Sequence, residues 1–199
     1  LPDSTGPIYT AWNFCKPPLH GWALRKMAAN PQLITPERAR EAYPALARWT
    51  EWWFNTRDLD GDGLPEYQHG SDSGWDNGTV FDEGVPVTTP DLQAHLLNQL
   101  HALAWLAPQA GHENDAPRWQ ERAESHRQRF IDKLWNGQQF ISRAAFTGAE
   151  HNRGQHCLLN HMAILAGEHL PRDIAARTAA FLEPDGPFIT AHGPATESP

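Results

Sequence analysis

Apolar residues recur every three to four positions in several long segments, which is the spacing of one face of an α-helix. The first segment follows a Thr-Pro-Glu start at residues 35–37, with a hydroxyl N-cap, proline at the first helical position and an acid in the first turn. Its inward face comprises Tyr43, Leu46, Ala47, Thr50, Trp53 and Phe54. A Thr-Pro-Asp start at residues 89–91 precedes a second face, which comprises Leu92, Leu96, Leu100, Leu103 and Ala107.

A third helix is predicted over residues 115–135, with Trp119, Ala123, His126, Phe130 and Leu134 facing inward. Shorter helices are predicted over residues 16–29, 154–167 and 172–182. Only residues 139–142, which follow an Asn-Gly turn, indicate a strand. The pattern predicts an all-α protein of consecutive antiparallel helices in a single domain over residues 1–199, with functional loops between the helices.

Composition limits what this domain binds. The formal net charge is −8 and no run of Lys or Arg occurs, which argues against nucleic acid. No apolar stretch approaches the roughly 20 residues that cross a bilayer, so no membrane partner is expected. The chain starts at Leu1 without a signal-peptide pattern, so we expect a mature or excised piece, and a bacterial-type cytoplasmic location is favoured over others that stay open. Cys15 and Cys157 are expected to be free buried thiols.

The acidic run at residues 58–66 is typical of a cation loop. Its aspartates alternate, Gly63 stands at the sixth position, and the Leu64 carbonyl stands at the seventh, as in the first half of an EF-hand loop. The twelfth position is His69 instead of a bidentate Glu, so the run is not an EF-hand. A structural Ca²⁺ is predicted, and no organic cofactor; the alternative is a solvated acidic turn. The predicted ligands are Asp58, Asp60, Asp62 and Leu64.

The next turn, at residues 69–77, combines glycines, a tryptophan and closely spaced acids. A glycosidase acid needs a carboxyl whose pKa is raised by apolar burial, so that it holds a proton near neutral pH. Trp75 is expected to supply that apolar wall to Asp76, and Asn77 a hydrogen bond. From the residues alone, a helix-capping role for Asp76 remains an open alternative.

These motifs, together with the Lys-Pro-Pro-Leu-His-Gly-Trp-Ala run at residues 16–23 and the segment 190–198, resemble glycoside hydrolase family 63, which is related to the trehalases. The resemblance spans nearly the whole chain and implies an (α/α)6 toroid, the six-hairpin glycosidase fold, as a partial barrel. It implies an inverting, exo-acting α-glycosidase, α-glucosidase-like, with a carbohydrate substrate. Asp76 matches the general acid of the family, and the aspartates of the cation loop match a calcium loop of some members.

The general base of the family is a Glu beyond a segment that lies further along than Pro199, so the resemblance implies that the base is outside these residues and that the remainder of the barrel is a partner. Sugar contacts are expected from residues around the acid, namely Trp12, Phe14, Lys16, His20, Trp22, His69, Asp72 and Trp75. For several of these residues the alternative is packing in the core or capping a helix, since most tryptophans pack in cores.

Two other functions stay open. The chain is interpreted alternatively as a catalytically silent, calcium-stabilised carbohydrate-binding or scaffold unit, or, within the same enzyme class, as a glucosyl- or mannosylglycerate hydrolase. The sequon at Asn77 is interpreted as chance, because a glycan there would block the site. Zinc at His156, Cys157 and His161 is not expected, because the spacing puts the histidines on different helix faces.

Overall fold

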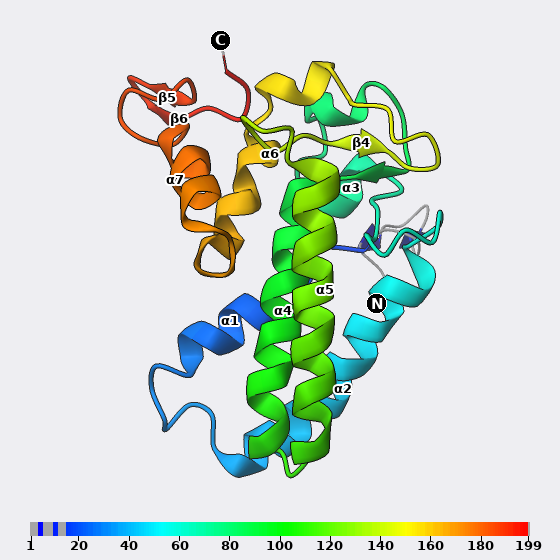
Figure 1. Cartoon of the computed structure of the whole chain (residues 1–199), viewed down its shortest axis with the longest axis vertical. Coiled ribbons are helices and arrows are strands. Elements are labelled where there is room, and N and C mark those ends of the chain that lie inside the picture. Colours follow the sequence, from blue (N-terminus) through cyan, green and yellow to red (C-terminus); the bar gives the residue numbers. More distant parts are fainter. Residues whose placement is uncertain (1–3, 6–9, 12–14, 199) are drawn as a thin grey trace.

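The computed structural model describes residues 4–5, 10–11 and 15–198. Two long helices, α4 (Pro90–Gln109) and α5 (Ala116–Leu134), lie antiparallel through the middle of the molecule (Figure 1). Helix α2 (Pro36–Thr56) and helix α1 (His20–Met27) both pack against α4. The three long helices predicted from the apolar spacing are confirmed, and α1 is shorter than the predicted range of 16–29.

The apolar faces account for these helices. Thr35 caps α2 through its hydroxyl, which accepts a hydrogen bond from Arg38 N at 3.4 Å. The inward residues of α5 are all buried, as the spacing predicted. Helix α4 is buried on every side over its first eleven residues, because α1, α2, α5 and the 3-10 helix η4 (Met162–His169) surround it. An all-round buried helix is the centre of a core rather than a surface element.

Gly21 shows how closely α1 approaches α4. A Cβ atom placed on Gly21 would lie 2.3 Å from the Cα of Gln99, which no side chain tolerates. The Gly21 N–H instead donates to Gln99 Oε1 at 3.3 Å, and Gln99 in turn donates to the Thr50 hydroxyl of α2 at 2.9 Å. One glycine therefore lets α1, α4 and α2 share a buried polar contact.

The predicted helix over residues 154–167 is wrong in its form. The structure has three short pieces there, namely η3 (Arg153–His156), α6 (Leu158–His161) and η4. Helix α7 (Arg172–Ala180) follows and matches its prediction. The predicted strand over residues 139–142 is displaced to β4 (Arg143–Ala144), which pairs antiparallel with β3 (Val87–Thr88). Backbone pairing with β3, which lies far away in the sequence, decides this position.

The remaining elements are short. They are α3 (Gly70–Ser73), η1 (Thr79–Phe81), η2 (Glu113–Asp115), β1 (Ser4–Thr5), β2 (Thr10–Ala11), β5 (Ile189–Thr190) and β6 (Gly193–Pro194). The strands β1 and β2 form one antiparallel pair and β5 and β6 another. The β3–β4 pair and α3 lie at the end of the bundle where α4 begins, together with the loops that connect α2 to α4 (Figure 1). The acidic motifs therefore share one end of the helical bundle.

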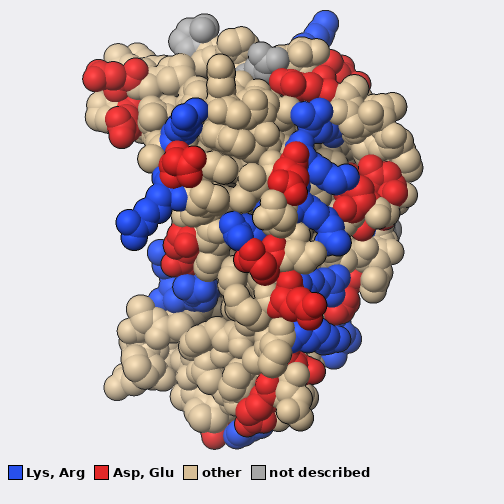
Figure 2. All heavy atoms as spheres, in the orientation of Figure 1, with Lys and Arg blue, Asp and Glu red and all other residues tan. Residues whose placement is uncertain are grey.

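Charged side chains are interspersed on the surface. On the face that α5 presents, acidic and basic side chains alternate rather than gather by sign (Figure 2). Pairs such as Arg122–Glu51, at 2.7 Å, and Arg127–Glu124 contribute to this pattern. Within the described part of the chain, no helix is both long and apolar enough to span a bilayer. Cys157 is a buried thiol outside any disulfide, as expected, whereas Cys15 is only partly buried.

Candidate active site

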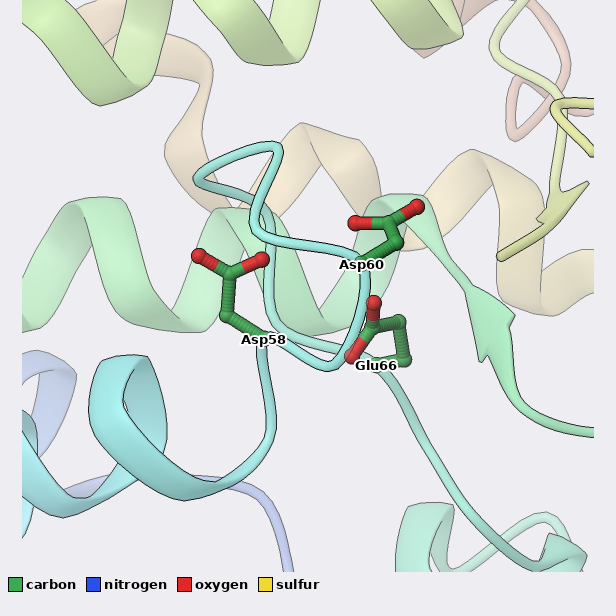
Figure 3. Close-up of side chains that lie close together, drawn as sticks. All are labelled: Asp58, Asp60 and Glu66. Atoms are coloured by element: carbon green, nitrogen blue, oxygen red, sulfur yellow. The ribbon is translucent and has the colours of Figure 1, made fainter. Parts of the chain in front are cut away.

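The acidic loop between α2 and α3 brings three carboxylates together. Oxygen atoms of Asp58, Asp60 and Glu66 lie within 4.8 Å of one another, and the three side chains stand on the same loop (Figure 3). The loop is folded by its own side chains, because Asp58 Oδ2 accepts from Gly63 N and Asp60 Oδ1 from Asp62 N, each at 3.1 Å. Both Gly61 and Gly63 adopt positive φ angles of 73° and 88°, which the turn requires.

Burial makes this cluster costly in the charged state. Glu66 is fully buried, and its pKa rises to about 8, mainly because burial removes water and also because Asp60 and Asp58 repel it. The pKa of Asp58 is also raised, first by burial and then by the neighbouring aspartates. Asp58 Oδ1 is buried without a hydrogen-bond partner among the described residues. Hard oxygen ligands with an unsatisfied buried atom fit a divalent cation such as Ca²⁺.

The cluster differs from the predicted ligand set. Asp62, predicted as a ligand, lies outside it, because its Oδ2 bonds Lys133 Nζ at 2.7 Å and its Oδ1 accepts from Leu64 N at 2.8 Å. The predicted ligand atom of Leu64 is its backbone carbonyl, which stays a prediction, and its side chain is buried in the main core. Glu66 takes the place of Asp62 in the cluster. Its only sequence signal was an acid at the ninth position of the loop.

The turn that carries Asp76 is rigidly built. Helix α3 ends at Gly74, whose φ of 81° stops the helix, and the Ser73 hydroxyl donates to Gly70 O at 2.7 Å while it accepts from Trp75 N at 2.9 Å. A Cβ on Gly70 would lie 2.7 Å from Asp76 O, so only glycine lets the two sides of the turn meet there. The turn therefore fixes the backbone of Asp76 relative to α3.

The Asp76 side chain faces solvent. It is 59% exposed, and Lys16 Nζ lies 3.9 Å from its Oδ1. The expected apolar wall is absent on this face of the described structure, because Trp75 turns its ring toward Val80 and Cys157 instead. Lys16 also donates to the Ser71 carbonyl, which places its ammonium group over the turn. A cation and a carboxyl thus stand together at the open side of this turn.

Asp72 has a different place from the one predicted. Its carboxylate is completely buried, accepting from Cys15 N at 2.8 Å, Arg57 Nη1 at 2.9 Å and Gln68 N at 3.0 Å. A group enclosed by three protein donors has no surface to offer a sugar. Its role in this structure is to join the chain before α1, the end of α2 and the start of α3.

The other predicted sugar contacts are dispersed. Trp22 is 43% exposed on α1, with Lys26 Nζ 5.8 Å from its ring centroid. His20 is exposed and meets Trp49 edge-on, with ring centroids 6.5 Å apart, and His69 is exposed and accepts from Ser71 N at 3.0 Å. Of the predicted contacts, Lys16, His69 and Trp75 lie on or over the Asp76 turn. Trp12 and Phe14 lie outside the described residues.

A buried acid from the Thr-Pro-Asp helix start lies near this end of the bundle. Asp91, in the first turn of α4, accepts from the Tyr67 hydroxyl at 2.9 Å, while its Oδ1 has no hydrogen-bond partner within residues 15–198. Burial raises the pKa of Asp91 to about 6, although the hydrogen bond from Tyr67 opposes the shift. The Thr-Pro-Asp helix start was the only sequence signal for this carboxyl.

Comparison with known proteins identifies the family of this chain. The family described as "Mannosylglycerate hydrolase MGH1-like glycoside hydrolase domain" matches residues 3–199. Two curated relatives from Selaginella moellendorffii, the mannosylglycerate hydrolases MGH1 and MGH2, are each 29% identical over 98 residues. That alignment covers 47% of this chain and 20% of each relative, so the chain corresponds to a limited part of their length.

Solved structures share the fold. A family 63 mannosylglycerate hydrolase from Thermus thermophilus, in complex with Tris, superposes with a TM-score of 0.72 at 16% identity, over 99% of this chain and 66% of that one. The same enzyme in complex with glucose gives 0.70 at 18% identity, over 94% of this chain and 59% of that one. The helices of the present chain thus share the fold of part of the (α/α)6 toroid seen in glycoside hydrolase family 63. Within it, the chain belongs to the mannosylglycerate hydrolase MGH1-like domain family.

Proposed function

We propose that this chain carries the general-acid side of an inverting, exo-acting α-glycosidase that cleaves a glycosylglycerate, with Asp76 as the proton donor. The observation that carries the proposal is the rigid turn that presents the Asp76 carboxyl at the loop end of the bundle, in a chain that belongs to a glycoside hydrolase family over residues 3–199. The curated relatives are named for mannosylglycerate, and Lys16 supplies a cation 3.9 Å from Asp76.

The proposed reaction follows from where the proton goes. Asp76 donates its proton to the glycosidic oxygen as the bond from that oxygen to the anomeric carbon breaks, and the glycerate leaves with a free hydroxyl. Water attacks the anomeric carbon from the opposite face, and a base outside the described residues takes its proton. In an inverting enzyme the two carboxyls stand roughly 6.5–9.5 Å apart to admit that water. The sugar is released with the opposite anomeric configuration.

Lys16 supports an anionic leaving group. The aglycone lies next to the general acid, because the acid protonates the oxygen that the aglycone keeps. A carboxylate on the aglycone would then reach an ammonium group that stands 3.9 Å from Asp76. Neutral α-glucosides lack this contact, so glycosylglycerates are the favoured substrates over simple glucosides.

The test uses the full-length polypeptide and three substrates, namely α-mannosylglycerate, α-glucosylglycerate and methyl α-glucoside. We expect kcat/KM to be highest for a glycosylglycerate and the first product seen by NMR to be the β-anomer. Replacing Asp76→Asn is expected to lower kcat at least about 100-fold while binding persists. The control Asp82→Asn changes an exposed acid a few residues away and should leave kcat unchanged. A fully active Asp76→Asn enzyme would contradict the proposal.

The open position of Asp76 favours one rival function, a silent carbohydrate-binding unit stabilised by a cation. The Asp76 side chain is 59% exposed, and the described residues do not enclose it in the apolar surroundings that a glycosidase acid needs. Calorimetry with the same three substrates separates the two functions, since the rival predicts heat of binding without product. Turnover of any of the three by the wild-type polypeptide excludes the silent unit.

We also propose that Asp58, Asp60 and Glu66 hold a structural Ca²⁺. The support is the mutual proximity of their oxygens and the buried unpartnered Asp58 Oδ1. Bound Ca²⁺ would offset the repulsion among these carboxylates and stiffen the loop that leads into α3.

A further inference from the structure

The loop that carries Asp76 is held from a distant part of the chain. Three residues after Asp76, the Thr79 backbone N–H donates to Glu197 Oε1 at 3.1 Å. The Thr79 hydroxyl donates to Glu197 Oε2 at 2.8 Å, in preference to the Arg153 carbonyl at 3.1 Å, since a hydroxyl has one proton. Both carboxylate oxygens of Glu197 therefore accept hydrogen bonds from Thr79. Bonds to an ionised acceptor are stronger than neutral ones.

The segment that carries Glu197 is itself anchored. Leu158 N donates to Thr196 O at 2.9 Å, and Ser198 N donates to His156 O at 2.8 Å. These bonds bracket Glu197 on both sides and pair it with Cys157 as an isolated antiparallel bridge. The carboxylate is therefore presented by fixed backbone rather than by a free end of the chain.

The segment that pairs with Glu197 also contacts the Asp76 turn. A Cβ on Gly78 would lie 3.5 Å from Cys157 Sγ, so the turn rests on that buried thiol. Burial raises the pKa of Cys157 to about 12, so the sulfur packs as a neutral group. One residue beyond Thr79, a ring N–H of His151 donates to Val80 O at 2.8 Å. Contacts from residues 151–157 therefore help to hold the loop that carries Asp76 in place.

A displacement of Thr79 would reach Asp76 through a short, closed piece of backbone. Gly78 N donates to Trp75 O at 2.6 Å, which spans Asp76, and Phe81 N donates to Gly78 O at 3.0 Å. These two bonds link the backbone of Thr79 to that of Asp76. An error of about 1 Å in the place of a reacting group lowers rate by about 100-fold.

We propose that Glu197 is a positioning residue for the general acid, acting through Thr79 on the Asp76 turn. The inference rests on the proposed function of Asp76. Glu197 fixes where the proton is delivered, and it neither donates that proton nor contacts the sugar.

The test uses two substrates that differ only in the leaving group. A glycosylglycerate needs a proton on its departing oxygen, whereas a 2,4-dinitrophenyl glycoside of the same sugar leaves without one. In the full-length polypeptide, Glu197→Ala is expected to lower kcat about 10- to 100-fold on the glycosylglycerate. On the dinitrophenyl glycoside the loss should stay under about threefold, because the proton is not needed. KM should be unchanged on both.

Three variants complete the design. Thr79→Val removes the hydroxyl partner and should show the same dependence on the leaving group. The double variant with Glu197→Ala should be no worse than Glu197→Ala alone, because the two residues act through one contact. Glu197→Gln keeps one acceptor for Thr79 N and should recover part of the rate. Glu113→Ala, an exposed acid in η2, is the control and should match the wild type.

The outcomes separate the two proposals. Equal losses on both substrates, or no loss, in Glu197→Ala and Thr79→Val would overturn the positioning role while Asp76 keeps its own. Asp76→Asn run in parallel must depend on the leaving group; if it does not, the general-acid assignment fails and the positioning role fails with it. If Glu197→Ala does not fold, Glu197→Gln and Thr79→Val decide the question.

Discussion

Arg57 Nη1 lies 2.9 Å from Asp72 Oδ2, and this ion pair is buried, with the side chains 4% and 0% exposed. Arg57 is the C-cap of α2, and Asp72 lies in α3, just before the Asp76 turn. The Asp72 carboxylate also accepts hydrogen bonds from the backbone N–H groups of Cys15 and Gln68. The pair thus ties the end of α2 to the candidate site, and the guanidinium group lies 5.4 Å from the Trp52 ring centroid.

Removing one partner of this pair should be strongly destabilising. Asp72→Ala leaves the Arg57 charge buried and two backbone donors without an acceptor. We expect the free energy of unfolding to fall by about 3–5 kcal/mol, measured by urea denaturation. Asp82→Asn, an exposed control, should change it by less than about 0.5 kcal/mol. A loss below about 1 kcal/mol for Asp72→Ala would mean that water replaces the carboxylate at little cost.

Calcium should raise the melting temperature if the carboxylate cluster binds it. Binding to the folded state alone stabilises by about 2.7 kcal/mol when the ligand is at about 100 times its dissociation constant. Glu66→Gln should abolish the shift, whereas Asp62→Asn should keep it, because Asp62 is paired with Lys133. The measurement is thermal unfolding with CaCl₂ or with EDTA. A calcium shift that survives Glu66→Gln but disappears in Asp62→Asn would restore the ligand set predicted from sequence.

Asp91 should make stability depend on pH. Its pKa rises from 3.8 to about 6 in the folded protein, so folding takes up a proton between these values. The contribution to stability is present below pH 3.8 and is lost as the pH rises through about 6. Asp91→Asn keeps an acceptor for Tyr67 and has no charge to lose.

The difference in unfolding free energy between Asp91→Asn and the wild type should therefore move in favour of the variant as the pH rises from about 4 to about 7, the range that spans both pKa values. Other groups titrate in both proteins and cancel in this difference. Urea unfolding at several pH values gives the curve. A flat difference across the range would show that Asp91 keeps an ordinary pKa in the folded protein.

Local patterns in the sequence are sufficient to predict the long helices. Thr35 and the residues behind it place α2, and the apolar face from Trp119 to Leu134 places α5, because helix starts and helical periodicity depend on neighbours within a few positions. The glycine-rich turn around Asp76 and the resemblance to the family could be predicted for the same reason, because both depend on short local motifs. The break of residues 153–169 into short pieces had no such local signal.

The role of each carboxylate depends instead on contacts between distant segments. Asp62 and Glu66 are both acidic residues of the same loop. Asp62 pairs with Lys133 of α5, whereas Glu66 is buried. Asp72 is enclosed by Arg57, and Glu197 reaches Thr79 from 118 positions away. The burial, the hydrogen-bond partners and hence the pKa of each carboxyl depend on packing between distant segments. A local sequence motif does not predict that packing.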